Sequence, residues 1–325
     1  MKVLVVGGTG NISTSIVQEL RRIGHDVAVV VRGTHRDELP SDVRRITADR
    51  KDYPRFEALM QKESWDAVID MVAFSADDAA SALRAFTGRA GHYVACSTVV
   101  TYGTDFTALP AHENEPQRAT DAYGRGKVAM EDVLRRASGA DRLPITILRP
   151  SHTFGRIPIV RQVTGFDPTF IDRLRRGRQI LVTDDAEKKT WMSLHVDDAA
   201  LAFANCLCRE QCFGNSYHVV GDETYSWADY HRRVGDALGL DVNLVPLPVE
   251  EITAAGGADV AILAVTGYDG WFTNDAIKRD VPEFQQNVSF DDGIRRNVEY
   301  AQAHGMITSA EEMTWEDELI RKVVG

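Results

Sequence analysis

The feature that most constrains the fold is a glycine-rich turn between an apolar run and an amphipathic pattern. Residues 3–6 are Val-Leu-Val-Val, as in a buried parallel strand, and the turn at 7–13 follows at once. Apolar residues then recur at helical spacing to Ile23, and a second apolar run covers 26–31. A strand, a glycine turn, a helix and a second strand form the βαβ unit in which such turns bind dinucleotides.

Each position of this turn has a distinct expected role. Gly7 permits the tight turn, and Gly10 lets a pyrophosphate approach the backbone at the positive end of the helix. Ser13 stands where a third glycine is usual, and it is small enough to keep the helix close to the strand. A glycine turn with no ligand is the alternative interpretation.

The end of the second strand indicates which dinucleotide is bound. An acid there would accept a hydrogen bond from the ribose 2′-hydroxyl of NAD, but the sequence reads Val31-Arg32-Gly33, with Arg36 close behind. Arg32 is placed to meet a 2′-phosphate. We therefore expect NADP as cofactor, with NAD as the alternative. The alternative interpretation of Arg32 is a solvated side chain at a strand end that binds no cofactor.

Strand and helix patterns alternate through the first half of the chain. Further apolar strand patterns cover 43–46, 67–70 and 92–97, and helical patterns cover 53–61 and 77–86. This order predicts an α/β fold with a doubly wound parallel Rossmann sheet.

Composition excludes several classes of function. The 325 residues carry a formal net charge of −11, which argues against a nucleic-acid-binding surface, and no apolar run is long enough to span a membrane. The four cysteines do not form a disulfide framework, so we expect a reducing, cytoplasmic compartment. Cys206, Cys208 and Cys212, predicted on a helix over 199–207 and beyond, are expected to be small buried residues rather than a metal site.

A Tyr-x-x-x-Lys pair supplies the expected chemistry. Tyr123 and Lys127 lie one turn apart on a helix predicted over 119–137. A neighbouring ammonium favours the phenolate, so we expect Lys127 to lower the pKa of Tyr123 and to suit it for proton transfer. The alternative is a solvated pair, which is common on helices.

Taken together, these motifs resemble the extended short-chain dehydrogenase/reductase family, the NAD-dependent epimerase/dehydratase group, and its atypical members in particular. The matching segments follow the order found in that family: Gly7-Gly8-Thr9-Gly10-Asn11-Ile12, Ala48-Asp49-Arg50, Ser97-Thr98-Val99-Val100-Thr101-Tyr102-Gly103, Tyr123-x-x-x-Lys127, Leu148-Arg149-Pro150 and Leu194-His195-Val196-Asp197-Asp198. The resemblance covers nearly the whole chain.

The resemblance implies a role for individual residues. Tyr123 would move the proton, Lys127 would hold the nicotinamide ribose, and Thr98 would hydrogen-bond the substrate oxygen. His195 would be structural. The implied cofactor-binding residues are Gly7, Thr9, Gly10, Asn11, Ile12, Arg32, Arg36, Asp49, Arg50, Ala73, Lys127 and Pro150. The implied substrate-binding residues are Ser75, Val99, His152, Arg156 and Trp191, with Arg161 as a further candidate.

The resemblance also implies the domain organisation and the partners. Residues 1–150, with a returning segment at about 192–222, would form the dinucleotide-binding domain, and 151–325 mainly a small interleaved substrate domain. The substrate would be a sugar or nucleotide sugar, and a homodimer would form through the helices at 77–86 and 119–137. Arginines 173, 175, 176 and 178 are expected to form a solvated helix face.

Two classes of function follow. One is an NAD(P)-dependent epimerase or ketoreductase acting at a carbinol or ketone carbon; the intact Thr98, Tyr123 and Lys127 favour it. Dehydration is disfavoured, because Val99 and Val100 supply no acid beside Thr98. The other is a non-catalytic nucleotide-binding or RNA-associated protein, against which the acidic balance argues.

Overall fold

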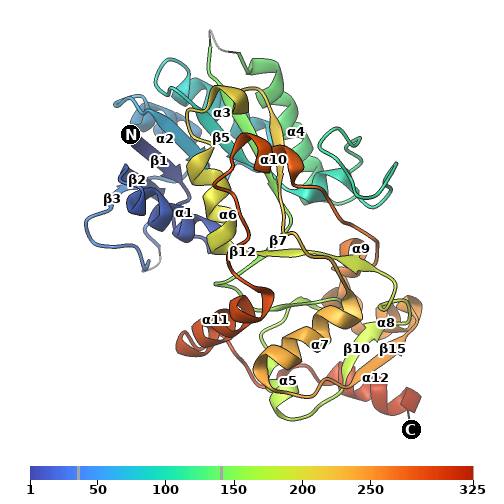
Figure 1. The fold of residues 1–325 in the computed structure, drawn as a ribbon. Coiled ribbons are helices and arrows are strands. Elements are labelled where there is room, and N and C mark those ends of the chain that lie inside the picture. Colours follow the sequence, from blue (N-terminus) through green and yellow to red (C-terminus); the bar gives the residue numbers. More distant parts are fainter. Residues whose placement is uncertain (35–36, 140–141, 325) are drawn as a thin grey trace. The chain divides into compact units, whose positions relative to one another are not determined.

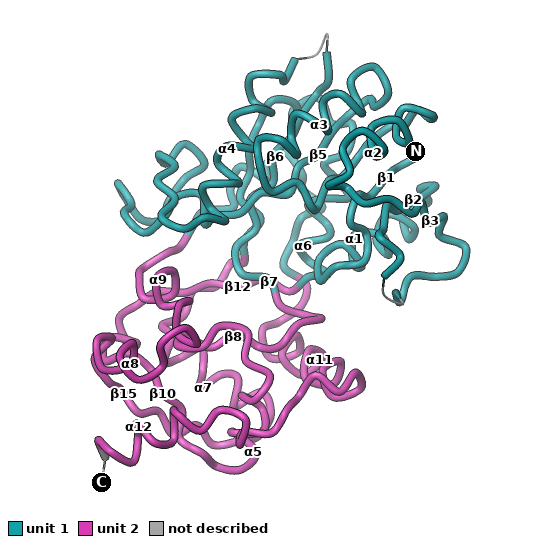
Figure 2. The backbone as a smooth tube through the Cα atoms, turned by 180° about the vertical axis from the view of Figure 1, so that it is seen from behind, with its two compact units in different colours: residues 1–153, 196–220, 272–286 teal, residues 154–195, 221–271, 287–325 magenta. Residues whose placement is uncertain are grey.

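The computed structural model describes residues 1–34, 37–139 and 142–324, and the chain forms two compact units (Figure 2). Unit 1 comprises Met1–Thr153, Val196–Val220 and Phe272–Gln286, and unit 2 comprises the remaining segments. The second return, at 272–286, was not expected. Tyr217 Oη donates to Asp280 Oδ2 at 2.8 Å within unit 1, which helps to hold this late segment beside the sheet.

Unit 1 is built on a seven-stranded parallel sheet in the order β13-β6-β5-β4-β1-β2-β3. The strands are β1 (Lys2–Val6), β2 (Asp26–Val31), β3 (Arg44–Thr47), β4 (Ala67–Asp70), β5 (Tyr93–Cys96), β6 (Ile145–Pro150) and β13 (Ser216–Val219). Central strands such as β4 and β5 are buried along their whole length, which explains their continuous apolar sequences.

Helices cover both faces of this sheet, so the predicted doubly wound fold is confirmed (Figure 1). One layer holds α1 (Asn11–Arg22) and α6 (Val196–Asn205), joined where Ser15 Oγ donates to Asp197 Oδ1 at 2.7 Å. The other holds α2 (Tyr53–Met60), α3 (Ala76–Phe86) and α4 (Ala122–Ala137), which share a buried apolar core with the strands. A short α10 (Asp275–Asp280) packs on β13.

Unit 2 has its own apolar core and shorter elements. Its strands are β8 (Val160–Arg161), β9 (Gly165–Phe166), β10 (Ile180–Thr183), β11 (Thr190–Trp191), β12 (Ser193–His195), β14 (Tyr225–Ser226) and β15 (Leu244–Leu247); β7 (His152–Phe154) crosses the boundary between the units. Its helices are α5 (Phe170–Arg175), α7 (Trp227–Leu238), α8 (Val249–Gly256), α9 (Leu263–Thr266), α11 (Phe290–Ala303) and α12 (Thr314–Val324).

Two expectations about unit 2 arginines are wrong. Arg161 does not line a pocket wall: its side chain is fully buried and pairs with Asp167 at 2.7 Å and Glu316 at 2.5 Å. Arg173 is also fully buried, paired with Glu316 and Asp317, so the arginine group is not a uniformly solvated face. Full burial of these guanidinium groups is possible because carboxylates surround them.

The cysteine segment also differs from its prediction. Helix α6 ends at Asn205, and Cys208 adopts a positive φ of 56°, so Cys206, Cys208 and Cys212 do not share a helix face. Cys206 and Cys212 are buried, as expected, while Cys208 is exposed. Among the residues placed in the structure, no group of histidine, cysteine or acidic side chains is arranged to hold a metal ion.

Candidate active site

The glycine turn between β1 and α1 is tight for steric reasons. Gly7 has a φ of +79°, and a Cβ there would lie 2.5 Å from Val72 Cγ1. A Cβ on Gly8 would lie 2.4 Å from Val29 Cγ1, so neither position accepts a side chain without displacing a neighbouring strand or loop. Thr9 and Gly10 are exposed at the tip of the turn, where a ligand can reach their backbone.

The first turn of α1 is suited to an anion. Gly10 is the N-cap and has no side chain to satisfy the following amides, and the first turn of the helix holds no acidic residue. Ser13, in place of the third glycine, is buried, and its Oγ accepts from the Gly10 amide at 2.7 Å. Asn11 and Ile12 are half-buried beside the turn. These residues fit the pyrophosphate of a dinucleotide.

The adenosine end of the predicted cofactor site is only partly as expected. Arg32 directly follows β2 and is exposed, whereas Arg36 lies outside the described residues. Asp49 is exposed after β3. The Arg50 side chain is buried, and its Nη2 donates to Asp70 Oδ2 at 3.1 Å and to the Asp78 carbonyl at 2.5 Å, while Nε and Nη1 have no hydrogen-bond partner among the described residues. A contact of Arg50 with the cofactor stays a prediction.

Thr98 and Tyr123 meet beyond the carboxyl end of β5. Thr98 is buried and caps the short 3-10 turn Val99–Tyr102, its Oγ1 accepting from Val100 N at 3.2 Å. Tyr123 lies in the first turn of α4, capped by Asp121. Tyr123 is 46% exposed, so a ligand can reach it, and its hydroxyl interacts with that of Thr98.

The expectation that Lys127 lowers the pKa of Tyr123 is wrong for this state of the protein. Although Tyr123 is 46% exposed, partial loss of water around the phenol raises the pKa of Tyr123 above its usual value, and the interaction with Thr98 offsets this only in part. The Lys127 ammonium lies 5.8 Å from the centre of the Tyr123 ring. The phenol is therefore protonated at neutral pH.

Lys127 is directed at the backbone instead. Its side chain is buried, and Nζ donates to the Ala73 carbonyl at 2.8 Å and the Cys96 carbonyl at 2.6 Å. Burial lowers the pKa of Lys127. These two bonds tie α4 to the ends of β4 and β5, and they leave one of the three N–H groups of the ammonium for a further acceptor.

Sequence reasoning missed three residues around this pair. Phe74 is 41% exposed, and its ring lies 4.4 Å from Lys127 Nζ and 6.2 Å from the Tyr123 ring. A Cβ on Gly126 would lie 2.5 Å from the Phe74 carbonyl, and one on Gly124 would lie 3.0 Å from that of Val100. Glycine lowers the stability of a helix interior. Two glycines so close together in α4 were therefore the signal that other backbone segments approach the helix closely there.

The predicted substrate residues are divided between the two units. Ser75 caps α3, its Oγ accepting from Asp78 N, and Val99 begins the 3-10 turn after Thr98. Burial lowers the pKa of His152 to about 4, so it is neutral at pH 7. Arg156 and Trp191 belong to unit 2, where Trp191 stacks on Trp227 with ring centres 4.2 Å apart. Pro150 ends β6 and is buried.

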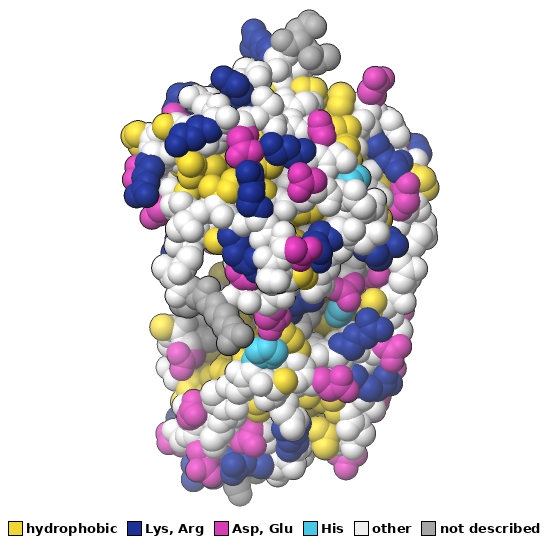
Figure 3. All heavy atoms as spheres, turned by 90° about the vertical axis from the view of Figure 1, so that its left-hand side faces the viewer, with side chains coloured by type: hydrophobic (Ala, Val, Ile, Leu, Met, Phe, Trp, Pro, Cys, Tyr) yellow, Lys and Arg dark blue, Asp and Glu magenta, His cyan; other side chains and the backbone are white. Residues whose placement is uncertain are grey.

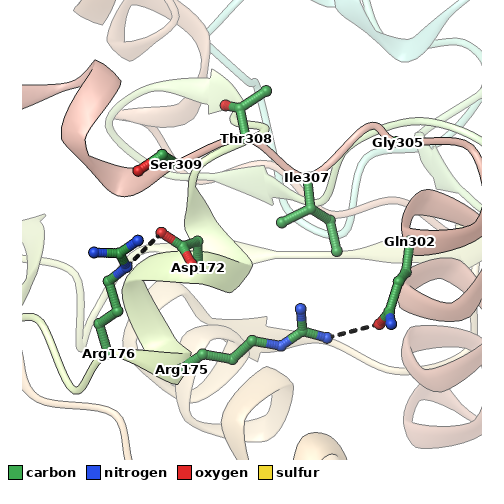
Figure 4. A pocket seen from close by; sticks show the side chains of 8 residues that line it. All are labelled: Asp172, Arg175, Arg176, Gln302, Gly305, Ile307, Thr308 and Ser309. Carbon is green, nitrogen blue, oxygen red and sulfur yellow. Dashed lines mark hydrogen bonds and ion pairs between the residues drawn. The ribbon is translucent and has the colours of Figure 1, made fainter.

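Two surface hollows lie elsewhere and contain none of the predicted site residues. One, of ≈ 360 Å³ in unit 2, has Arg175 directed at Gln302 and Arg176 at Asp172 (Figure 4). The other, of ≈ 440 Å³ in unit 1, is lined by polar residues that include Arg135 and Arg149. Their charged groups already have protein partners, so neither hollow is offered as the active site.

Charge and apolar length agree with the sequence analysis. On the face drawn in Figure 3, basic and acidic side chains are interspersed rather than gathered into a basic patch. No helix in the described ranges is long and apolar enough to cross a bilayer.

A seven-stranded parallel sheet with a glycine turn at its first strand defines a Rossmann-type fold. A sequence profile of the NAD dependent epimerase/dehydratase family matches residues 3–211, and the chain belongs to this family. The chain is 29% identical to 2'-dehydrokanamycin reductase from Streptomyces kanamyceticus over 287 residues, which cover 88% of this chain and 80% of that protein.

Two further similarities are informative. The chloroplast stem-loop binding protein of 41 kDa b from Arabidopsis thaliana is 27% identical over 237 residues, or 68% of this chain and 59% of that protein. The crystal structure of UDP-glucose-4-epimerase from Stenotrophomonas maltophila, with bound NAD and formylated UDP-arabinopyranose, superposes with a TM-score of 0.77 at 21% identity. It covers 95% of this chain and 100% of that one, and shows the fold.

Proposed function

We propose that this protein is an NAD(P)H-dependent ketoreductase that acts on a ketone of a sugar or sugar-like substrate. The observation that carries the proposal is the placement of the exposed Tyr123 in the first turn of α4, with the ammonium of Lys127 5.8 Å from its ring and bonded to the carbonyls of Ala73 and Cys96, and with Thr98 two residues past Cys96. Thr98, Tyr123 and Lys127 lie past the carboxyl ends of parallel strands or at the start of the adjoining helix, where such sheets bind ligands.

The residues of this chain divide the work of reduction. The glycine turn and the first turn of α1 would hold the pyrophosphate, and the bound nicotinamide would supply the hydride. Thr98 would donate a hydrogen bond to the ketone oxygen, and Tyr123 would give that oxygen its proton. The remaining N–H of Lys127 would bind the nicotinamide ribose and place it beside Tyr123.

The direction of the reaction is inferred from the expected cofactor and from the relatives. Tyr123 is protonated at pH 7, as ketone reduction needs, but a tyrosine of ordinary pKa is protonated there as well, so its state does not choose the direction. The exposed Arg32 after β2, with no acid at 31–33, favours a 2′-phosphate and hence NADPH. The similarity to 2'-dehydrokanamycin reductase supports reduction as the direction.

A nucleotide-sugar epimerase is the second candidate. Several relatives are UDP-glucose 4-epimerases, such as that of Lacticaseibacillus casei, which is 28% identical over 178 residues. Such an enzyme would keep NAD bound and return the hydride to the same carbon. A non-catalytic nucleotide-binding protein is a third outcome, motivated by the chloroplast relative.

Nucleotide analysis and turnover separate these candidates. The purified protein is denatured and the released nucleotide identified; it is then assayed with NADPH or NADH and 2'-dehydrokanamycin, and separately with UDP-glucose. Oxidation of NADPH by the ketone, with no bound NAD, supports the reductase. Stoichiometric NAD with epimerisation of UDP-glucose overturns it, and dinucleotide binding without turnover of either substrate supports the non-catalytic binding protein.

Assembly and compartment stay predictions. We expect a homodimer through α3 and α4 and a cytoplasmic location. Sedimentation of the purified protein as a monomer would contradict the first.

A further inference from the structure

A buried carboxylate lies on the same face of α4 as the proposed proton donor. Tyr123, Lys127 and Glu131 are spaced four residues apart, so each is about one turn beyond the last. The side chain of Glu131 is fully buried, although glutamate is rarely buried without partners. The proposed reaction gives Glu131 no role, so its burial needs a separate account.

Donors from four segments of unit 1 converge on this carboxylate: the end of β5, the end of β6, the loop before α4 and the last turn of α4. Ser97 Oγ and Arg149 Nε (3.0 Å) donate to Oε1. Arg149 Nη2 (2.7 Å), Gln117 Nε2 (2.8 Å) and an Arg135 guanidinium nitrogen donate to Oε2. Burial opposes the charge of Glu131 more than any other single influence, but the hydrogen bonds and charge of Arg149 together with the Ser97 bond outweigh it, and the pKa of Glu131 is lowered.

The donors are next in sequence to residues of the proposed site. Ser97 precedes Thr98 at the end of β5, and Arg149 precedes Pro150 at the end of β6. Arg149 Nη1 also donates to Tyr102 Oη at 2.5 Å, and Tyr102 in turn bonds His218 Nε2 of β13 at 2.7 Å. One carboxylate thus connects α4 to the strand ends where substrate and nicotinamide would lie.

We infer that Glu131 is a positioning residue, which acts through Ser97 to hold the Thr98 hydroxyl where it and the Tyr123 hydroxyl can both reach the ketone oxygen. This inference rests on the proposed function, because it assigns Glu131 to the reaction of that same site. Well-packed apolar residues often stabilise a fold as well as a buried ion pair does, whereas an oriented carboxylate also fixes the direction of its donors. A misplacement of about 1 Å at a reacting group can cost about 100-fold in rate.

Two substitutions separate this role from support of the fold. Ser97→Ala removes one hydroxyl and leaves the Arg149–Glu131 ion pair intact. Glu131→Gln keeps the shape of the side chain but leaves the buried Arg149 without its charge partner and Arg135 with Asp132 alone, so it is the variant that risks misfolding. Asp132→Asn is the matched control: Asp132 is the next residue of α4, is 47% exposed, and pairs at the surface with Arg135 at 3.5 Å and Arg136 at 3.8 Å, so its loss touches the outer edge of the cluster but neither Ser97 nor Arg149.

The first measurement needs no substrate. The protein is labelled with ¹³C at the tyrosine Cζ, the Tyr123 signal is assigned by its loss in Tyr123→Phe, and Thr98→Ala defines the shift caused by loss of the Thr98 bond. We expect the Tyr123 signal in Ser97→Ala and Glu131→Gln to move toward its position in Thr98→Ala, and that in Asp132→Asn to stay at the wild-type position. A wild-type signal in folded Ser97→Ala overturns the inference, even if its unfolding temperature has fallen.

The second measurement is kinetic and uses 2'-dehydrokanamycin with NADPH. In Ser97→Ala we expect kcat to fall about 10- to 100-fold, while KM and the dissociation constant of NADPH change less than about twofold because no binding contact is removed. An unchanged kcat overturns the inference. If the wild type reduces no ketone, the proposed function fails, and the tyrosine spectrum still decides whether Glu131 positions Thr98.

Discussion

Each unit buries one cluster of arginines around a glutamate, and the two clusters are chemically alike. In unit 1 the Glu131 cluster joins Glu131 to Arg149 and Ser97. In unit 2 the Glu316 cluster joins Glu316 to Arg161 at 2.5 Å and Arg173 at 3.3 Å, and Glu316 Oε1 accepts from the Leu181 amide at 2.8 Å. In each cluster the carboxylate is almost fully shielded from water.

The difference lies in what the partners are attached to. The partners of Glu131 stand one residue from Thr98 and Pro150, so they bear on the proposed site. Those of Glu316 stand on β8, α5 and β10, and none is next in sequence to Thr98, Tyr123, Lys127 or Pro150; Glu316 therefore fastens α12 to the body of unit 2. Burial of a charge does not by itself indicate a function. The role of a buried charge depends on which backbone segments its partners hold in place.

The largest effect is expected from the Glu316 cluster, and on stability alone. Glu316→Gln leaves the buried guanidinium groups of Arg161 and Arg173 short of their counter-charge, so we expect a loss of about 3–5 kcal/mol in the unfolding free energy of unit 2, measured by urea denaturation. NADPH binding in unit 1 should be unchanged in conditions where the variant is folded.

The matched control for this prediction is Glu311→Gln. Glu311 is 68% exposed and pairs with Arg176 at 3.1 Å on the surface, so its loss should cost less than about 1 kcal/mol. Equal losses for the two variants would show that the Glu316 cluster does not fasten α12.

The opposite behaviour is expected at the site itself. Tyr123→Phe removes the proton donor and leaves the ring, so ketone reduction should slow by at least about 100-fold, with little change in unfolding temperature or NADPH affinity. Tyr268→Phe makes the same chemical change on a tyrosine of unit 2 that is 48% exposed, and should keep the wild-type rate. Retained activity in Tyr123→Phe would remove Tyr123 from the mechanism.

Most of the fold of unit 1 was predictable, because its signals are local. The turn at 7–13, the apolar strands and the helix periodicity each lie within a dozen residues, and the parallel sheet follows from their alternation. The return of residues 272–286 to the sheet was not, since a contact such as Tyr217 with Asp280 joins segments 63 residues apart. No sequence pattern within either segment predicts that contact.

The candidate site was predictable by residue type but not by orientation. The sequence placed Tyr123 and Lys127 one turn apart, yet the Lys127 ammonium bonds two backbone carbonyls, so its expected effect on the phenol is absent. The surroundings of Arg161 and Arg50 were also not predictable. Each was expected to contact a ligand, but each side chain is buried against carboxylates from other elements. Which charges become paired depends on tertiary packing.

A third prediction distinguishes the units by pH. Burial lowers the pKa of His231 in unit 2 to about 3, and its Nδ1 bonds the Trp227 carbonyl at 2.6 Å. The unfolded chain therefore binds the proton more readily, so this stability is present above pH 6.5 and is lost as the pH falls toward 3. We expect about 2 kcal/mol less stability at pH 5 than at pH 7 from this group, at 1.36 kcal/mol per pKa unit.

His231→Gln should flatten that pH dependence. Tryptophan fluorescence follows it, because four of the five tryptophans, at 191, 227, 271 and 315, belong to unit 2. The control His112→Gln changes an exposed histidine of unit 1 and should leave the slope of the unit 2 transition as in the wild type. An unchanged slope in His231→Gln would mean that His231 does not contribute.

The smallest effect is expected at the cofactor end, where the charge involved is exposed rather than buried. Arg32→Ala should weaken NADPH binding about tenfold and NADH binding much less, because only the former offers a 2′-phosphate to the guanidinium group. Titration of each nucleotide by fluorescence measures both constants. Arg89→Ala removes a cation between α3 and β5, at the edge where the strands begin, and should alter neither constant. Equal losses for the two nucleotides in Arg32→Ala would refute the phosphate contact and return NAD as the cofactor. An effect confined to NADPH would show that the exposed charge of Arg32 binds the ligand directly. The two buried clusters, in contrast, hold parts of the protein in place.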